Sequence, residues 1–300
     1  MKIITAWIQA IRPKTLPLAL SSTVLGSFIA ASEKEFHWSV FVLASLTTLL
    51  LQILSNLAND YGDFARGTDK HDRIGPARMV QSGLIKPRQM AFAIGLVVGL
   101  SLICGTLLIF EGTRGNSPGI KIFYFLLGIA AIAAAIKYTI GRKPYGYIGL
   151  GDLFVFIFFG LTGVIGTYYL HTQHFRPDIL LPAASVGLLS AGVLNINNMR
   201  DYQSDKEASK RTFVVLIGNQ WAKFYHLSLL FGAVITGSLF TILNYRSGFQ
   251  LLFLTTTPLL LHNVLSVYHY TKPIELNEEL KKLALSTLLF SFTFGIGLMF

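Results

Sequence analysis

Residues 38–63 read WSVFVLASLTTLLLQILSNLANDYGD, an apolar run over about 38–58 that ends in asparagine and aspartate. The run is long enough to cross the hydrocarbon core of a bilayer as a helix. A second apolar run, over about 179–198, ends in the same way in NNMRDYQSD, residues 197–205. Carboxylates are costly to keep at a membrane boundary and by default indicate function. The repeated pattern predicts a membrane protein with a polar site built from two helix ends.

The composition of the whole chain agrees with a membrane protein. Its 300 residues are 52% hydrophobic and only 13% charged, and the mean hydropathy is +0.56. These values lie outside the soluble globular range. The single cysteine, Cys104, lies within an apolar run, so a disulfide framework is excluded. The net charge of +10 does not indicate nucleic acid, because the basic residues cluster in loops between apolar runs.

Apolar runs of spanning length predict an all-α integral membrane protein with nine transmembrane helices. They lie at about 16–32, 38–58, 89–110, 121–140, 149–170, 179–198, 222–244, 250–268 and 283–300. No cleavable signal peptide is expected at the N-terminus. Ile4, Trp7, Ile8 and Ile11 fall on one helical face, which predicts an interfacial helix before the first span.

The loop charges predict the orientation of the chain. Of the 25 Lys and Arg residues, 20 fall on the side of the N-terminus and 5 on the other side. Because positive loops stay inside, we expect a cytoplasmic N-terminus, an outer C-terminus and a bacterial cytoplasmic (inner) membrane location. Both Asn/Asp segments then lie on the cytoplasmic side, next to the two long loops at about 59–88 and 199–223.

The spacing within the two segments predicts that they face one cavity. Asn197, Asp201 and Asp205 are spaced i, i+4, i+8, and Asn59 and Asp63 are spaced i, i+4, so each set shares a helix face. We expect Gly67 to break the first helix and Asp69 to approach from a loop. Carboxylate and amide oxygens suit Mg²⁺. The predicted metal ligands are Asn59, Asp63, Asp69, Asn197, Asp201 and Asp205, of which all but Asp69 are also the candidate catalytic residues.

Basic residues near these segments offer counter-charges for phosphate oxygens. The candidates are Arg73, Arg78, Arg142, Lys143, Lys210 and Arg211. A magnesium ion bridging to a diphosphate would neutralise the charge that builds up as that group leaves. A lipid with a diphosphate head and a long apolar tail fits such a site in a membrane. The competing interpretation is that these Asp and Asn residues only cap helices or meet water.

At these residues the chain resembles the UbiA superfamily of intramembrane prenyltransferases, whose paired motifs are of the types NDxxDxxxD and DxxxD. The resemblance covers essentially the whole chain. It is carried by Arg12–Pro17, Asn56–Asp63, Gly67–Asp69, Arg73–Pro76 with Arg78, Ser82-Gly83, Gly149–Asp152 and Asn197–Asp201. The first motif departs from the general pattern, because Gly67 stands where an aspartate is expected and Asp69 follows two residues later. This shift resembles the branch that acts on 1,4-dihydroxy-2-naphthoate rather than on 4-hydroxybenzoate.

The resemblance implies a single membrane prenyltransferase domain over residues 1–300, with nine helices around a central cavity. The cavity would open to the cytoplasm under a cap made by the two long loops, with a lateral gap for the prenyl tail. The implied reaction moves a polyprenyl group from its diphosphate to 1,4-dihydroxy-2-naphthoate, with Mg²⁺ as cofactor and loss of CO₂, in menaquinone biosynthesis. The implied partners are the polyprenyl diphosphate, the aromatic acid and the lipid bilayer, with no nucleic acid.

Several residues keep two interpretations. Arg142 and Lys143 either hold the diphosphate or anchor the chain at the membrane surface. Asp152 either contacts the aromatic acceptor or caps the fifth span. In the eighth span, His262 and Asn263 are expected to form an inward-facing hydrogen-bonded pair.

Two competing functions stay open. Prenyl transfer to another acceptor, 4-hydroxybenzoate or homogentisate, uses the same framework. A cation-coupled transporter also fits a chain with nine crossings and acidic residues in the membrane. Carriers place such charges near the bilayer midplane, whereas the centres of these apolar runs carry almost none.

Overall fold

The described part of the chain is helical throughout. The computed structural model describes residues 2–67, 74–75 and 77–300, and these contain no strand. The α-helices are α1 (Lys2–Ile11), α2 (Leu16–Ser32), α3 (Trp38–Arg66), α4 (Pro87–Gly112), α5 (Pro118–Lys137), α6 (Gly151–Val155), α7 (Gly166–Thr172), α8 (Leu180–Arg200), α9 (Tyr202–Glu207), α10 (Phe213–Ile217), α11 (Asn219–Leu243), α12 (Thr257–His269) and α13 (Leu276–Gly297). Other helical segments are η1 (Pro13–Thr15), η2 (Tyr145–Tyr147), η3 (Phe156–Ile165), η4 (Pro177–Ile179), η5 (Gly248–Thr256) and η6 (Pro273–Glu275).

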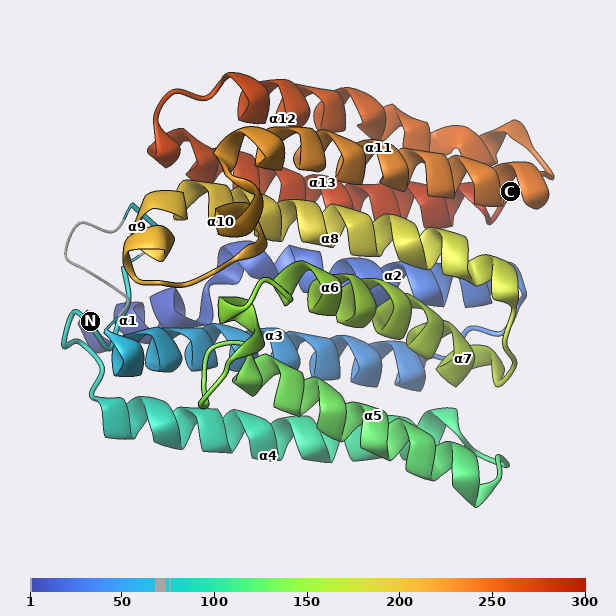
Figure 1. Cartoon of the computed structure of the whole chain (residues 1–300). Helices are drawn as coiled ribbons and strands as arrows, with labels where there is room; N and C mark the ends of the chain where they lie inside the picture. The colour runs from blue at the N-terminus through green and yellow to red at the C-terminus, as the bar shows by residue number, and fades with distance from the viewer. Residues whose placement is uncertain (1, 68–73, 76) are drawn as a thin grey trace.

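Nine helical spans within the described residues are long and apolar enough to cross a membrane, as the sequence predicts. They run side by side along one axis, with α1, α9 and α10 at one end of the bundle (Figure 1). We call this end the polar end and the opposite end the far end. Two boundaries differ from the prediction, because α3 continues to Arg66 and α13 begins at Leu276. Both extensions are polar turns that a hydropathy pattern does not detect.

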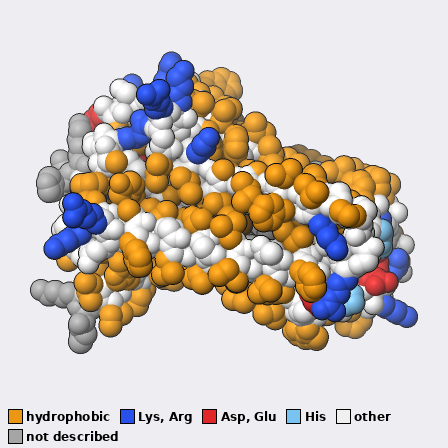
Figure 2. All heavy atoms as spheres, turned by 90° about the horizontal axis from the view of Figure 1, so that it is seen from below, with side chains coloured by type: hydrophobic (Ala, Val, Ile, Leu, Met, Phe, Trp, Pro, Cys, Tyr) orange, Lys and Arg blue, Asp and Glu red, His pale blue; other side chains and the backbone are white. Residues whose placement is uncertain are grey.

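The outer surface supports insertion in a bilayer. Seen from below, hydrophobic side chains cover the middle of the molecule, while Lys and Arg gather towards its two ends (Figure 2). Large apolar side chains such as Phe92 and Trp221 are 75% and 69% exposed. An exposed apolar surface of this extent is typical of contact with lipid. The chain is therefore a multi-pass membrane protein.

The fifth span contains an uncommon helical form. After α6 the chain winds as a π-helix, η3, for ten residues before α7 resumes the α form. π-helices are rare, are mostly single turns and often occur at functional sites. Phe154 and Phe158 stack with ring centroids 6.2 Å apart. The wide winding of η3 thus places aromatic rings one behind another along the interior of the bundle.

The buried core lies mostly on one side of the bundle, among α2, α8, α11, α12 and α13. Phe253, Phe290 and Phe294 are fully buried there, and the rings of Phe253 and Phe294 lie 4.9 Å apart. η3 packs tightly on α8, since a Cβ on Gly160 would lie 2.6 Å from the Cα of Gly187. The spans α4 and α5 contribute little to this core and are the least buried of the nine.

Candidate functional site

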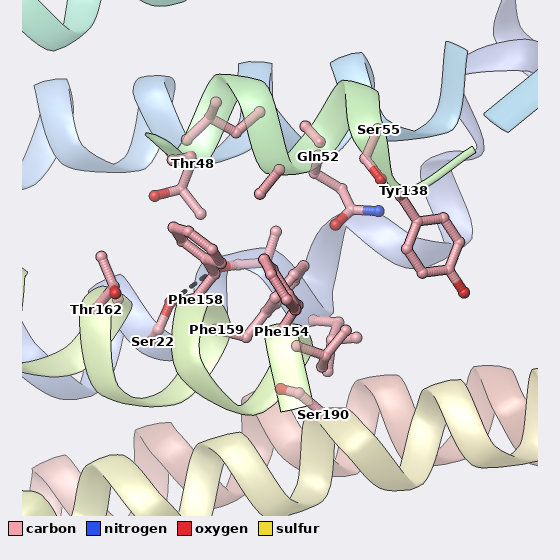
Figure 3. Close-up of a pocket in the computed structure, with 18 of the residues that line it drawn as sticks. Ser22, Thr48, Gln52, Ser55, Tyr138, Phe154, Phe158, Phe159, Thr162 and Ser190 are labelled. Atoms are coloured by element: carbon pink, nitrogen blue, oxygen red, sulfur yellow. Dashed lines mark hydrogen bonds between the residues drawn. The ribbon is translucent and has the colours of Figure 1, made fainter. Parts of the chain in front are cut away.

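A cavity of about 330 Å³ lies inside the bundle among α2, α3, α5, η3 and α8. Thr48 and Gln52 of α3 lie on one side of it, and Phe154 and Phe158 lie on the other (Figure 3). Most of its wall is apolar. Its polar lining residues near the polar end of the bundle include Asn59, Asp63, Arg78, Asn197 and Lys210. The cavity therefore joins a charged mouth to a long apolar interior.

The first Asn/Asp segment occupies the last turns of α3. Asn59 and Asp63 line the cavity, as their i, i+4 spacing predicts. Gly67 ends the helix with φ +63°, a left-handed conformation that glycine adopts without strain, so the predicted break is confirmed. Asp60 points elsewhere, because its carboxylate accepts hydrogen bonds from the backbone N–H groups of Met79 and Val80 at 2.9 and 3.2 Å. It fastens the loop before α4 to α3.

Asp63 is the buried carboxylate of the first segment that lines the cavity. It forms an ion pair with Arg78, and the two side chains are only 3% and 4% exposed. The hydroxyl of Tyr147 donates a second hydrogen bond to Asp63 over 2.8 Å. Buried carboxylates need such partners to remain charged. Arg78, predicted as a phosphate ligand, therefore reaches the site.

The second segment continues the predicted face across a junction between helices. α8 ends at Arg200 and α9 begins at Tyr202, yet the N–H of Asp201 bonds the carbonyl of Asn197, and that of Asp205 bonds Asp201. Arg200 donates two hydrogen bonds to Asp201, at 2.8 and 2.7 Å. It donates a third to the Asn197 side chain at 2.9 Å. The i, i+4 bonding continues across the junction, and Arg200 joins Asn197 and Asp201. Of the three predicted residues, Asn197 lines the cavity, whereas Asp201 and Asp205 do not.

Lys210 is the charged group between the two segments. Its ammonium lies 3.4 Å from Asp205 and 5.3 Å from the centre of the Tyr147 ring. Burial alone would lower the pKa of Lys210, but Asp63, Asp205, Tyr147 and Asp201 raise it above its usual value. Because Lys210 contacts Asp205 and the Tyr147 ring, and Tyr147 bonds Asp63, the two segments meet around this buried cation.

The pKa values of Asp205 and Tyr138 are raised by burial and by carboxylates of both segments. Burial raises the pKa of Asp205 to about 6, with Lys210 opposing the shift and Asp201 and Asp63 adding to it. Burial also raises the pKa of the Tyr138 phenol, and Asp152, Asp205 and Asp63 raise it further. Tyr138 lines the cavity. The mouth of the cavity is therefore a region where negative charge accumulates and basic residues compensate it.

The oxygen atoms that the two segments offer are of the type that binds magnesium. Asn59 and Asp63 offer amide and carboxylate oxygens to the cavity from one side, and Asn197 from the other. The Oδ2 atom of Asp205 is buried and has no hydrogen-bond partner, which leaves it available to a further ligand. Oxygen donors of this type are those that Mg²⁺ prefers. Within the described ranges, no three carboxylate, histidine or cysteine side chains form a ready metal cluster. Asp63 pairs with Arg78, Asp201 with Arg200 and Asp205 with Lys210.

Three of the remaining predicted residues, which are basic, lie on the surface outside the cavity. Arg142 and Lys143 are exposed, and the backbone of Arg142 lies near Arg66. Arg211 is also exposed, and its N–H bonds the carbonyl of Tyr147 at 3.2 Å. None of the three lines the cavity. Two further predicted residues, Asp69 and Arg73, lie outside the described residues.

Asp152 is not a helix cap. The N-cap of α6 is Leu150, and Asp152 lies in the first turn, buried, with its Oδ1 3.4 Å from the Tyr225 hydroxyl. Its Oδ2 is buried without a hydrogen-bond partner. The capping interpretation is therefore wrong. Asp152 does not line the cavity itself, although its neighbours Phe154 and Val155 do.

The expected pair of His262 and Asn263 is wrong. Asn263 is buried and bonds Glu279 at 2.9 Å, and its Oδ1 lies 3.0 Å from Nε2 of His226. His262 is exposed and lies against Ser266. The true partners come from α11 and α13, which no local pattern could bring together.

Sequence reasoning also missed Tyr147 and Arg200 as members of the site. Tyr147 follows the basic pair 142–143 in a loop, and nothing in its neighbours marks it. Arg200 stands between two predicted ligands, so its position was a signal. A cation beside a buried carboxylate such as Asp201 is the expected partner that keeps the carboxylate charged.

Comparison with known proteins decides the family. Residues 19–296 match the UbiA prenyltransferase family. The chain belongs to this family. It is 44% identical over 296 residues to the 1,4-dihydroxy-2-naphthoate octaprenyltransferase of Haemophilus influenzae, covering 98% of this chain and 95% of the relative. It is 41% identical to the enzyme of that name from Escherichia coli, covering 98% of this chain and 94% of the relative.

Solved structures of UbiA proteins share the fold. A UbiA homologue from Archaeoglobus fulgidus, bound to GPP and Mg²⁺, matches with a TM-score of 0.69 at 16% identity, covering 98% of this chain and 99% of the other. A UbiA homologue from Aeropyrum pernix matches with the same TM-score at 15% identity, covering 95% and 97% of the two chains. The predicted all-helical UbiA-type fold is confirmed.

Proposed function

We propose that this UbiA-family protein transfers a polyprenyl group from an allylic polyprenyl diphosphate to 1,4-dihydroxy-2-naphthoate. The observation that carries the proposal is that the two Asn/Asp segments meet around Lys210, at the mouth of an apolar cavity that Asn59, Asp63 and Asn197 line. The relatives from Haemophilus influenzae and Escherichia coli, both named for this reaction, support the acceptor. Their names also make octaprenyl diphosphate the first donor to test.

The charged mouth would hold the diphosphate and its metal ions. We assign Asn59, Asp63 and Asp69 to one side of a Mg²⁺ site and Asn197, Asp201 and Asp205 to the other. The Mg²⁺ and GPP bound to the archaeal homologue support this assignment. When bound, Mg²⁺ supplies positive charge that stabilises the departing diphosphate.

The two basic residues at the mouth would bind the diphosphate in place of their carboxylate partners when substrate enters. Arg78 and Lys210 are held against Asp63 and Asp205. Both line the cavity, so both could turn from carboxylate to phosphate oxygens when the diphosphate binds. The diphosphate is then held by cations on side chains that are already buried and oriented, which limits the entropy lost on binding.

The apolar part of the cavity would protect the reaction from water. The allylic C–O bond breaks, and its electron pair leaves with the diphosphate. The ring carbon that bears the carboxylate forms the new C–C bond, and that carboxylate then leaves as CO₂. The rings of Tyr145 and Phe154, stacked 4.0 Å apart, line this cavity and would offer π electrons to a positive charge that develops inside it. Demethylmenaquinone forms after oxidation of the product.

We further propose that residues 1–300 form one domain in the bacterial inner membrane, with a cytoplasmic N-terminus. The bias of Lys and Arg to one set of loops supports this orientation. It would place the mouth of the cavity on the cytoplasmic side, where both hydrophilic substrate groups arrive. Arg73, Arg142, Lys143 and Arg211 would guide the diphosphate there, and Asp152 would support the acceptor end of the cavity through Tyr138.

The test is removal of one carboxylate from each segment. Purified Asp63→Ala and Asp201→Ala are assayed with octaprenyl diphosphate, 1,4-dihydroxy-2-naphthoate and Mg²⁺, and product is followed by chromatography. Both variants should lose prenyl transfer while they remain folded in detergent. Glu111→Ala is the matched control, because this acid lies at the far end of α4.

Two outcomes would refute the proposal. Retention of more than about a tenth of wild-type activity by both variants would mean less than about 1.4 kcal/mol of lost transition-state stabilisation, too little for metal ligands. Wild-type protein that forms no product with any aromatic acceptor would also overturn it. Product formation that a chelator abolishes would exclude a cation-coupled transporter as the function.

A further inference from the structure

The second Asn/Asp segment contains a buried arginine that already occupies its oxygen atoms. Arg200 donates from Nε and Nη2 to the two carboxylate oxygens of Asp201, at 2.8 and 2.7 Å. The same Nη2 group donates to the side-chain oxygen of Asn197 at 2.9 Å. The side chains of Arg200 and Asp201 are only 3% and 4% exposed. One guanidinium therefore holds three oxygen atoms that are candidates for binding magnesium.

The guanidinium of Arg200 is anchored by a residue outside both segments. Its Nη1 group donates to the side-chain oxygen of Asn277 at 3.0 Å. Asn277 lies in the first turn of α13, and Leu280, about one turn further along that helix, lines the cavity. The side-chain nitrogen of Asn277 donates to the carbonyl of Ile74, between α3 and α4, at 3.4 Å. Asn277 thus connects Arg200 to the start of α13 and to the loop after the first segment.

Arg200 differs from the two basic residues that line the cavity. Arg78 and Lys210 face the space where a diphosphate would meet them. Arg200 does not line the cavity, so its charge acts on the carboxylate of Asp201 rather than on an incoming phosphate. Two parallel N–H···O bonds make this arginine–carboxylate pair strong and specific in geometry. A metal ion that binds these oxygens must compete with the hydrogen bonds and with the positive charge of the guanidinium.

We propose that Arg200 occupies the place of the metal ion in the second segment, and that Asn277 is the positioning residue that holds it there. This inference rests on the proposed function, which assigns Asn197 and Asp201 to the Mg²⁺ site. The guanidinium keeps the buried carboxylate paired when no metal is bound. Metal binding replaces its bonds to Asp201, while the bond to Asn277 keeps the displaced guanidinium at the site. Arg200 therefore lowers the affinity of the second segment for metal alone.

This competition has a consequence for the order of binding. A diphosphate brings negative charge to the mouth of the cavity, so a metal ion that arrives with it competes better against Arg200 than a free metal ion does. The second segment would thus take up metal together with the prenyl donor. Binding of metal without donor, which would lead to no reaction, is disfavoured.

The other end of α8 offers a matched arrangement far from the site. There Arg176 donates from Nε to Asp178 at 3.1 Å and forms an ion pair with it through Nη2, which also donates to Asn244 at 2.9 Å. α8 has 21 residues, so the two arrangements lie about 30 Å apart. An arginine, an aspartate and an asparagine thus meet at both ends of α8, and those at the far end provide control substitutions.

The test measures metal binding without substrates. Full-length protein in detergent is titrated with Mn²⁺, an ion that prefers oxygen ligands and whose free form is measured by electron paramagnetic resonance. Arg200→Gln removes the competing charge and should bind Mn²⁺ about tenfold or more tightly than wild type, equivalent to about 1.4 kcal/mol. Asn277→Asp keeps Arg200 but adds a carboxylate that draws the guanidinium from Asp201, so the affinity should rise about threefold or more. Arg176→Gln and Asn244→Asp should stay within about twofold of wild type, because distant sites act independently.

The sign of the change decides the inference. Weaker Mn²⁺ binding by Arg200→Gln would overturn it, because Arg200 would then support the ligands instead of competing with metal. Unchanged affinity in both Arg200→Gln and Asn277→Asp would also overturn it, as would an equal rise in the two far-end controls. If Arg200→Gln does not fold in detergent, Asn277→Asp decides alone, since it keeps the arginine.

Prenyl transfer by the same wild-type preparation separates this inference from the proposed function. Product formation together with unchanged Mn²⁺ affinity in both site variants would refute the inference alone. Tighter Mn²⁺ binding by both site variants, with no product from the wild type and any aromatic acceptor, would refute the proposed function alone.

Discussion

The hydroxyl of Tyr147 should control how well Asp63 binds metal, and Tyr147→Phe removes it. In the structure this hydroxyl donates to Asp63 over 2.8 Å, while Arg78 holds the other carboxylate oxygen. When Arg78 turns to the diphosphate, the Tyr147 bond is what keeps the carboxylate oriented. A hydrogen bond to a charged group contributes about 1.5–3 kcal/mol. That energy corresponds to about a 10- to 150-fold loss in apparent Mg²⁺ affinity.

The assay is a Mg²⁺ activation curve at saturating substrates, with the thermal midpoint in detergent measured in parallel. Tyr147→Phe should shift the curve to higher Mg²⁺ with little change in the thermal midpoint, because the ring remains. Tyr270→Phe is the control, since that hydroxyl bonds Asn219, outside the cavity lining. An activation curve that moves by less than about twofold would refute the positioning role, since it would leave less than about 0.5 kcal/mol for the bond.

Three further outcomes follow from the packing. Lys210→Met leaves buried carboxylates without their cation, at a cost of about 3–5 kcal/mol, so the thermal midpoint should fall. Added Mg²⁺ should raise the thermal midpoint of this variant more than that of the wild type, and equal increases would contradict the reasoning. Gly62→Val should destabilise by about 1–3 kcal/mol in thermal unfolding, because an added Cβ would lie 2.6 Å from Thr139 Oγ1. Asn263→Leu removes the hydrogen bonds that Asn263 makes to His226 and Glu279, at a cost of about 1–3 kcal/mol, and should lower the thermal midpoint. Because Asn263 lies outside the cavity lining, kcat/KM should stay constant, and a fall in kcat/KM alone would contradict this.

The spans and the first half of the site could be predicted because they depend on local patterns. Run length alone located the nine spans, and i, i+4 spacing placed Asn59 and Asp63 on the cavity. Gly67 ended α3 as expected, since a left-handed residue at that position is a local requirement. These features depend on neighbours within about two helical turns, a range in which helix geometry fixes the answer.

The ion pairs and the π-helix could not be predicted, because they depend on contacts between distant segments. Arg78 reaches Asp63 from the far side of a loop, and Tyr147 reaches it from another. The π winding of η3 could not be predicted from the sequence, since an apolar run such as residues 156–165 also suits an ordinary α-helical span. Asn263 shows the same limit, because its neighbour His262 points outwards while its partners come from other helices.

The uneven burial of the bundle has a consequence for how such enzymes diversify. The helices α8, α11 and α13 carry the dense core, whereas α4 and α5 lie on the outside of α3 with few buried side chains. The spans α4 and α5 nevertheless contribute Gly105, Ile109 and Gly128 to the cavity wall. Changes on this helical hairpin can therefore reshape one side of the cavity at small cost to folding, while the mouth keeps its chemistry.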